Sequence, residues 1–458
     1  MARLDRDFTK GNVGSLLVRF SLPFLLSNLV QALYSVADMY IVGMFNDAAS
    51  LSGVNIGGQI TNLVAVLTIG LAQGGTVLVA QYYGAKRFED VSETIGTMLS
   101  FLILLSLGLT AVMLALSRPM LMLIQTPPES MNEALAYLRI CLAGNVFIFG
   151  YNALSAIQRG LGDSKRPLIF VSIACALNVG LDLLFVGAFS MGASGAALAT
   201  VISQAVSMLL AVIYLRRSDF LFDFSLRGFR IKADKVRGIL RVGLPSSAHN
   251  VLVNLSFLLM TALVNGYGVY ASAAVGVVGK LNSFAIMPSS AMNMSVSSLA
   301  AQNIGAGRRD RALLALRYGI LISLCIGIAM FTVANLFPDA LIGIFSDDPA
   351  VQAMGKAYLR GFSFDYLVVP FAFCMNGLLI GAGHTRFALF NGLLSSIVVR
   401  MPVAWLLSRA GLELMGIGLA APIASLAGAV ISLWFIASGR WKRDVTGIHR
   451  LEDEQASA

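Results

Sequence analysis

A stretch near the amino end, "RFSLPFLLSNLVQALYSVADMYIVGMF" at residues 19–45, has the composition of a membrane-spanning helix. About 20 apolar residues in a helix are enough to cross the hydrocarbon core of a bilayer. From Phe20 to Phe45 the only charged side chain is Asp38. A carboxylate at the centre of such a helix costs about 2.5–3.5 kcal/mol on insertion scales. We therefore expect Asp38 either to have a function or to hydrogen-bond a neighbouring helix.

Similar apolar stretches recur along the whole chain of 458 residues, which is 57% hydrophobic and only 12% charged. Soluble domains are about 25% charged. The sequence therefore predicts an all-α integral membrane protein. Breaks at glycine, proline and charged residues divide it into twelve spans, which are 17–41, 54–80, 93–115, 132–158, 166–187, 193–215, 238–266, 272–300, 313–336, 354–380, 387–408 and 416–437.

The lysines and arginines predict how these spans are oriented. Most of the 33 lie in alternate connections or at the span ends beside them, with the largest group at 216–241. The opposite connections, such as 44–55 and 345–350, have few. By the positive-inside rule both termini are cytoplasmic, in a multi-pass protein of the inner (plasma) membrane. The net charge of +9 is then a topology signal, and we expect a lipid bilayer and no nucleic acid as a partner.

The chain also contains an internal repeat. "AQYYGA" at 80–85 recurs as "AQNIGA" at 301–306, and "AYLR" at 136–139 recurs at 357–360, both 221 residues later. Six spans per half put both halves in the same orientation, related by a pseudo-twofold axis along the membrane normal. The predicted organisation is an N-terminal lobe of six spans, a basic cytoplasmic linker, a second lobe of six spans and a cytoplasmic tail, at 1–215, 216–237, 238–440 and 441–458.

The sequence shows no motif for catalysis or for binding a metal. The three histidines are scattered, the four cysteines lie in apolar runs without C-x-x-C spacing, and "GVVGKLN" at 276–282 lacks the spacing of a phosphate-binding loop. We expect no metal, no cofactor and no enzyme. Alternating-access transporters are built from two lobes around a central cleft. Because the sequence has no phosphate-binding loop for ATP, an ion gradient would be the energy source.

Polar residues inside the predicted spans gather in the first half. Gln31, Tyr34 and Asp38 share one face of the first span, and Asn178 and Asp182 share a face of the fifth. Asn152 in the fourth span and Thr200 in the sixth add to the set. The repeat copies of the two aspartates are apolar, which favours a function over a structural role.

The second half has ionisable residues of its own, among them Lys280, Asp365 and Arg400. Lys280 and Asp365 could pair across the lobe, and an ion pair that holds helices together is the preferred interpretation.

The twelve-span duplicated plan, together with "AQYYGA", "AQNIGAG" and "QRGLGDSKRP" at 158–167, resembles the MATE family of multidrug and toxic-compound exporters. The Asp in the first span with "NVGLD" at 178–182 is similar to the DinF-type branch. The resemblance implies that the first lobe's cavity is lined by Gln31, Tyr34, Asp38, Asn152, Asn178, Asp182 and Thr200, and that Asp38 is a protonation site. Other branches have an acidic pair in spans seven and ten. Span seven has no acid here, which argues against a sodium site in the second lobe.

These observations together predict a secondary active antiporter that works as a monomer. It would export cationic or amphipathic organic compounds in exchange for H⁺ or Na⁺, with Asp38 and Asp182 coupling the ion. A flippase for a lipid-linked precursor is the alternative, and it would need a larger cationic cleft. A membrane-embedded enzyme is a third hypothesis, and it would need paired acids or a histidine cluster.

Overall fold

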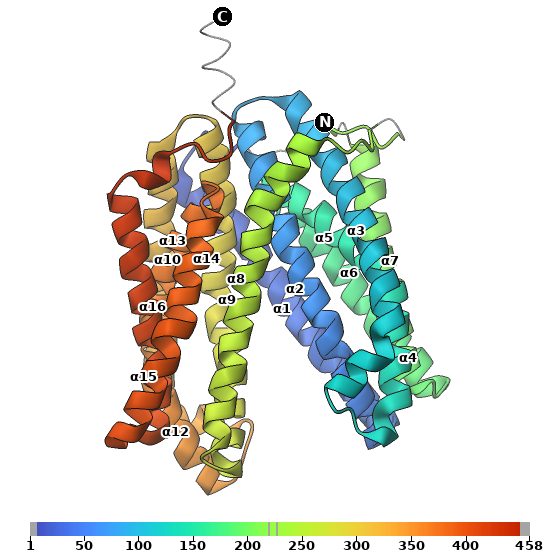
Figure 1. Ribbon diagram of the computed structural model, residues 1–458, viewed down its shortest axis with the longest axis vertical. Helices are drawn as coiled ribbons and strands as arrows, with labels where there is room; N and C mark the ends of the chain where they lie inside the picture. Colours follow the sequence, from blue (N-terminus) through green and yellow to red (C-terminus); the bar gives the residue numbers. More distant parts are fainter. Residues whose placement is uncertain (1–6, 219, 226–227, 449–458) are drawn as a thin grey trace, which may run out of the picture. The chain divides into compact units, whose positions relative to one another are not determined.

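The computed structural model describes residues 7–218, 220–225 and 228–448, and all regular structure within these ranges is helical (Figure 1). The main helices, in chain order, are α1 (Val13–Phe45), α2 (Ala48–Gly84), α3 (Phe88–Leu123), α4 (Met131–Ala143), α5 (Asn145–Gly160), α6 (Lys165–Asp182), α7 (Gly192–Arg217), α8 (Ala233–Asn265), α9 (Val269–Gly305), α10 (Arg309–Leu336), α11 (Pro338–Gly343), α12 (Pro349–Ser363), α13 (Asp365–Gly381), α14 (Thr385–Leu393), α15 (Arg400–Leu407) and α16 (Glu413–Ala437). Three π-helical segments, η2 (Leu183–Ala188), η3 (Leu394–Val399) and η4 (Ser408–Leu412), continue α6, α14 and α15.

The described helices form twelve membrane spans. Nine continuous helical stretches of the described chain are long and apolar enough to cross a bilayer, and two bent pairs, α4 with α5 and α12 with α13, make two more. One of the nine, Thr385–Ala437, has 53 residues, which at 1.5 Å per residue is far longer than a bilayer is thick. The chain turns back at Gly411, where φ is +90°, and α15 then packs beside α16 (Figure 1). This stretch is therefore two spans, and the predicted fold class is confirmed.

The sequence did not predict that the fourth and tenth spans are broken. α4 and α5 meet at a bend of 49°, and α12 and α13 meet at a bend of 43°. The first bend lies at Gly144, where an added Cβ would be only 2.4 Å from the side chain of Val201 on α7. Close approach of a neighbouring helix thus requires glycine here, and the contact is between residues far apart in the sequence.

The helices form two compact units, which are described separately. Among the described residues, unit 1 contains residue 7 and those within 22–247, and unit 2 contains residues 8–21 and 248–448. Each unit therefore includes the beginning of a long helix that continues in the other unit. This division differs from the lobes drawn from the sequence, whose boundary lay in the linker at 216–237.

Contacts in unit 1 explain why it includes the beginning of α8. Lys235 has a side chain that is only 5% exposed, and its Nζ lies 2.5 Å from the Asp90 carboxylate of α3. The same Nζ lies 4.3 Å from the centre of the Tyr82 ring. Further along α8, the Ser247 hydroxyl donates to the Leu67 carbonyl of α2 at 3.0 Å. These contacts fix the first part of α8 to α2 and α3.

Matching contacts in unit 2 hold residues 8–21. Phe8 is fully buried, and its backbone N–H donates to Gln302 Oε1 at 3.1 Å. Arg311 donates to the carbonyls of Phe8 and Gly11 at 3.2 and 3.0 Å. The "AQNIGA" motif and the residues after it thus anchor this segment, as "AQYYGA" and the residues after it anchor the beginning of α8.

Candidate functional site

The first of the candidate side chains lie on one face of α1. Asp38 is 7% exposed, and its Oδ1 is buried without a hydrogen-bond partner among the described residues. One turn earlier, the Tyr34 hydroxyl is 2.9 Å from the Thr200 hydroxyl of α7. The predicted face of the first span therefore points into unit 1, and the Tyr34–Thr200 hydrogen bond fixes it to α7.

The other carboxylate comes from α6. Asn178 and Asp182 are 1% and 0% exposed. Apart from the Asp38 carboxyl group beside Asp182, neither side chain has a hydrogen-bond partner within the part of the chain that the structure describes. The Asp182 carboxyl group lies close enough to Asp38 for the two to interact electrostatically. Asp182 is also the last residue of α6 before the π-helical segment η2, and such segments are frequent at functional sites.

Apolar side chains surround this carboxyl pair. A buried cluster contains Ile41 of α1, Val54 of α2, Tyr137 and Cys141 of α4 and Val186 of η2. In such surroundings two adjacent ionised carboxylates repel each other and lose their hydration. A proton or a monovalent cation shared between them would relieve both effects. The two adjacent buried carboxyl groups therefore favour a single positive charge at this position.

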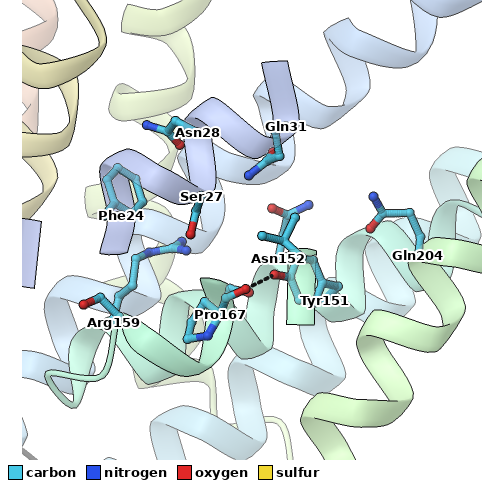
Figure 2. Close-up of a pocket in the computed structure, with 12 residues that line it drawn as sticks. Phe24, Ser27, Asn28, Gln31, Tyr151, Asn152, Arg159, Pro167 and Gln204 are labelled. Atoms are coloured by element: carbon cyan, nitrogen blue, oxygen red, sulfur yellow. Dashed lines mark hydrogen bonds between the residues drawn. The ribbon is translucent and has the colours of Figure 1, made fainter. Parts of the chain in front are cut away.

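A cavity of about 80 Å³ in unit 1 contains two more of the predicted residues, Gln31 and Asn152 (Figure 2). Its wall is made by α1, α5, α6 and α7, with the residues Phe24, Ser27, Asn28, Gln31, Tyr151, Asn152, Ser155, Arg159, Ser164, Pro167, Val171 and Gln204. The Tyr151 hydroxyl donates to the Pro167 carbonyl at 3.0 Å and fixes α5 against α6. The structure thus separates the predicted residues into a carboxyl pair and a polar cavity that Gln31 and Asn152 line.

Several residues of this cavity were not predicted. Arg159 directly follows the predicted fourth span and was counted there only as a charge that sets the topology. Asn28 and Gln204 are amides within apolar spans, a signal that could have found them. Gln204 lies four residues after Thr200, one turn further along the same helix face.

The predicted Lys280–Asp365 pair is not formed. Lys280 is exposed and its Nζ lies 5.9 Å from the centre of the Phe345 ring. Asp365 is 3% exposed and its charged neighbour is Arg400, which is 8% exposed and stacks on Phe257 at 4.9 Å. Helical spacing within each span could not show which cation of unit 2 faces Asp365, because the answer depends on how α9, α13 and α15 are rotated about their axes.

Comparison with known proteins places the chain in a group of transporters. The MatE family model matches residues 23–184 and 245–406, the two halves of the predicted repeat. The chain is 31% identical to the probable multidrug resistance protein YpnP of Bacillus subtilis, over 95% of this chain and 97% of that protein. It is 28% identical to the probable multidrug resistance protein NorM of Thermotoga maritima, over 93% of both chains.

Solved structures agree with the fold. A structure of an outward-facing multidrug resistance MATE family transporter superposes with a TM-score of 0.89 at 24% identity, over 95% of this chain and 98% of that one. A transporter from Pyrococcus furiosus superposes with a TM-score of 0.88, also at 24% identity and with the same coverage.

Proposed function

Because the chain belongs to the MATE family of transport proteins, we propose that it is a secondary antiporter that exports cationic or amphipathic organic compounds in exchange for protons or sodium ions. It would work by alternating access in the cell membrane, with both termini in the cytoplasm. Relatives are named as multidrug resistance and multidrug export proteins, which supports drug-like molecules as substrates.

The observation that carries this proposal is the buried carboxyl pair of Asp38 and Asp182. Apart from the contact between the two carboxyl groups, Asp38 Oδ1 and both Asp182 oxygens have no hydrogen-bond partner among the described residues, so the free energy of the site depends on a positive charge that comes from outside. A coupling ion and a cationic substrate would compete for the same carboxyl groups. Because one must leave before the other binds, the protein would exchange the ion for the substrate. Tyr34, Asn178 and Thr200 would set the affinity by hydrogen bonding and by orienting α1 against α6 and α7.

The energetics are consistent with one returning ion per substrate. Export of a monovalent cation against a membrane potential of about 100 mV requires about 2.3 kcal/mol. One proton or sodium ion that returns in exchange cancels this electrical contribution. The concentration gradient of the ion then drives the concentration gradient of the substrate.

Ethidium efflux from cells that express the chain tests the proposal. The proton gradient and the sodium gradient are collapsed separately, and the rate of efflux is compared with that of cells without the protein. Loss of efflux with one gradient identifies the coupling ion. Efflux that survives the loss of both gradients would contradict secondary transport.

A further inference from the structure

The cavity of unit 1 has the electrostatics of an anion site. Nine of its twelve lining residues are polar, none is an aspartate or a glutamate, and its one charged side chain is Arg159. For a protein whose proposed substrates are cations, an acid-free cavity with an arginine in its wall is not explained by the exchange at Asp38.

Arg159 has no carboxylate partner in the described ranges of the chain. Its guanidinium points from the last turn of α5 toward Phe24 and Ser27 of α1 (Figure 2), and its Cζ lies 5.7 Å from the centre of the Phe24 ring. Asp163, on the turn after α5, is engaged elsewhere. Its Oδ2 lies 3.2 Å from the Arg166 guanidinium, and its Oδ1 accepts the backbone N–H groups of Lys165 and Arg166 at 3.1 and 3.3 Å.

Hydrogen-bond donors line the same cavity as Arg159. Asn28, Gln31 and Gln204 bring amide groups to the cavity. Ser155 is 4% exposed, and its hydroxyl has no hydrogen-bond partner among the residues described. A guanidinium with neighbouring neutral donors is the arrangement that recognises carboxylate and phosphate groups.

The size of the cavity limits what it can hold. A single water needs about 10–15 Å³ of such space, so the cavity has room for one oxyanion group. Sites for whole drug-sized molecules are about 300–1,000 Å³. The rest of a larger ligand would therefore lie outside the cavity.

We propose that this cavity binds the oxyanion group, a carboxylate or a phosphate, of an amphipathic molecule, with Arg159 as its charge partner. The ligand could be a solute from the cytoplasm or a phospholipid, since both present the same chemistry. The site is distinct from the Asp38–Asp182 pair and does not require that the aspartates couple an ion.

The test uses the purified full chain in a neutral detergent and measures its thermal unfolding. One arm adds 1-naphthoate, a soluble aromatic carboxylate, and the other adds short-chain phosphatidylglycerol. The variants are Arg159→Gln, which removes the charge, and Arg159→Lys, which keeps the charge but not the forked geometry. Arg409→Gln is the matched control, because Arg409 also stacks on an aromatic ring, at 4.3 Å from Trp405, but does not line the cavity.

We expect at least one of the two probes to raise the unfolding temperature of the parent and of Arg409→Gln. Arg159→Gln should bind that probe at least about tenfold more weakly, as expected for the loss of a charge-assisted hydrogen bond, and Arg159→Lys should be intermediate. Stabilisation by naphthoate alone identifies a solute, and stabilisation by the lipid alone identifies a membrane ligand. The proposal is overturned if neither probe stabilises the parent, or if Arg159→Gln binds both probes as tightly as the parent. If Arg159→Gln does not fold, the same comparison is made with Arg159→Lys.

Discussion

Asp38→Asn removes the charge of the proposed coupling site and keeps nearly the same shape. Asp38 is 7% exposed and its Oδ1 has no hydrogen-bond partner within the described residues, so the variant loses no hydrogen bond at that atom. Removal of a buried, unsatisfied charge beside Asp182 should raise the free energy of unfolding, by about 1–3 kcal/mol. A carboxylate that only packs helices together would give a loss of stability instead.

Transport should respond in the opposite way. A one-for-one exchange of a proton for a monovalent cation is driven only by the pH gradient, and one pH unit corresponds to about 1.36 kcal/mol, or a tenfold substrate gradient. Asn cannot take up or release a proton. With a gradient of one pH unit, the parent should therefore build up an approximately tenfold ethidium gradient across a liposome membrane, whereas Asp38→Asn should only equilibrate the dye.

The assay pairs efflux from proteoliposomes with thermal unfolding of the same preparations. Asp47→Asn is the matched control, because Asp47 is exposed and caps α2 by accepting the Ser50 N–H at 2.9 Å. That hydrogen bond holds the pKa of Asp47 below its usual range, so the control also removes a real negative charge. Asn caps a helix as well as Asp does, and this variant should pump like the parent. An Asp38→Asn protein that builds up the tenfold gradient would refute the assignment of the coupling site.

Three further predictions test other parts of the structure. Asp182→Asn should reduce coupled efflux as strongly as the change at Asp38. Asp365→Asn, by contrast, should mainly lower the amount of folded protein in the membrane. If Asp365→Asn is expressed normally but does not transport, the coupling site lies in unit 2. Tyr34→Phe removes the hydrogen bond to α7 and should lower the free energy of unfolding by about 1 kcal/mol, and an unchanged melting curve would show that the bond contributes nothing. In a variant without native cysteines, a cysteine at Asp347 should react with an impermeant reagent outside intact cells and one at Glu89 should not; the reverse pattern would invert the topology.

Most of the fold follows from the sequence because each span carries its own signal. A run of about 20 apolar residues between charged connections is a local property, and α1, α2 and α3 extend the predicted spans by only a few residues at each end. The bend at Gly144 has no such local signal. It depends on the approach of Val201, which the sequence places 57 residues away without indicating a contact.

The candidate site was predictable to the same extent and for the same reason. Helical spacing put Gln31, Tyr34 and Asp38 on one face, and the structure turns that face into unit 1. Spacing could not show that Tyr34 meets Thr200, since partners on different helices are chosen by rotation of the helices about their axes. From the sequence, Arg159 was assigned only a role in setting the topology. The structure shows that its side chain also lines a polar cavity.

The exchange of helix beginnings between the two units has a consequence for biosynthesis. The segment at residues 8–21 leaves the ribosome before the rest of the described chain, but its partners Gln302 and Arg311 are made about 300 residues later. Unit 1 likewise lacks the beginning of α8 until residues 233–247 have been synthesised. Neither half of the gene therefore encodes a complete folding unit. Two fragments divided in the connection between α7 and α8 should each be degraded when expressed alone, and should accumulate only when they are produced together.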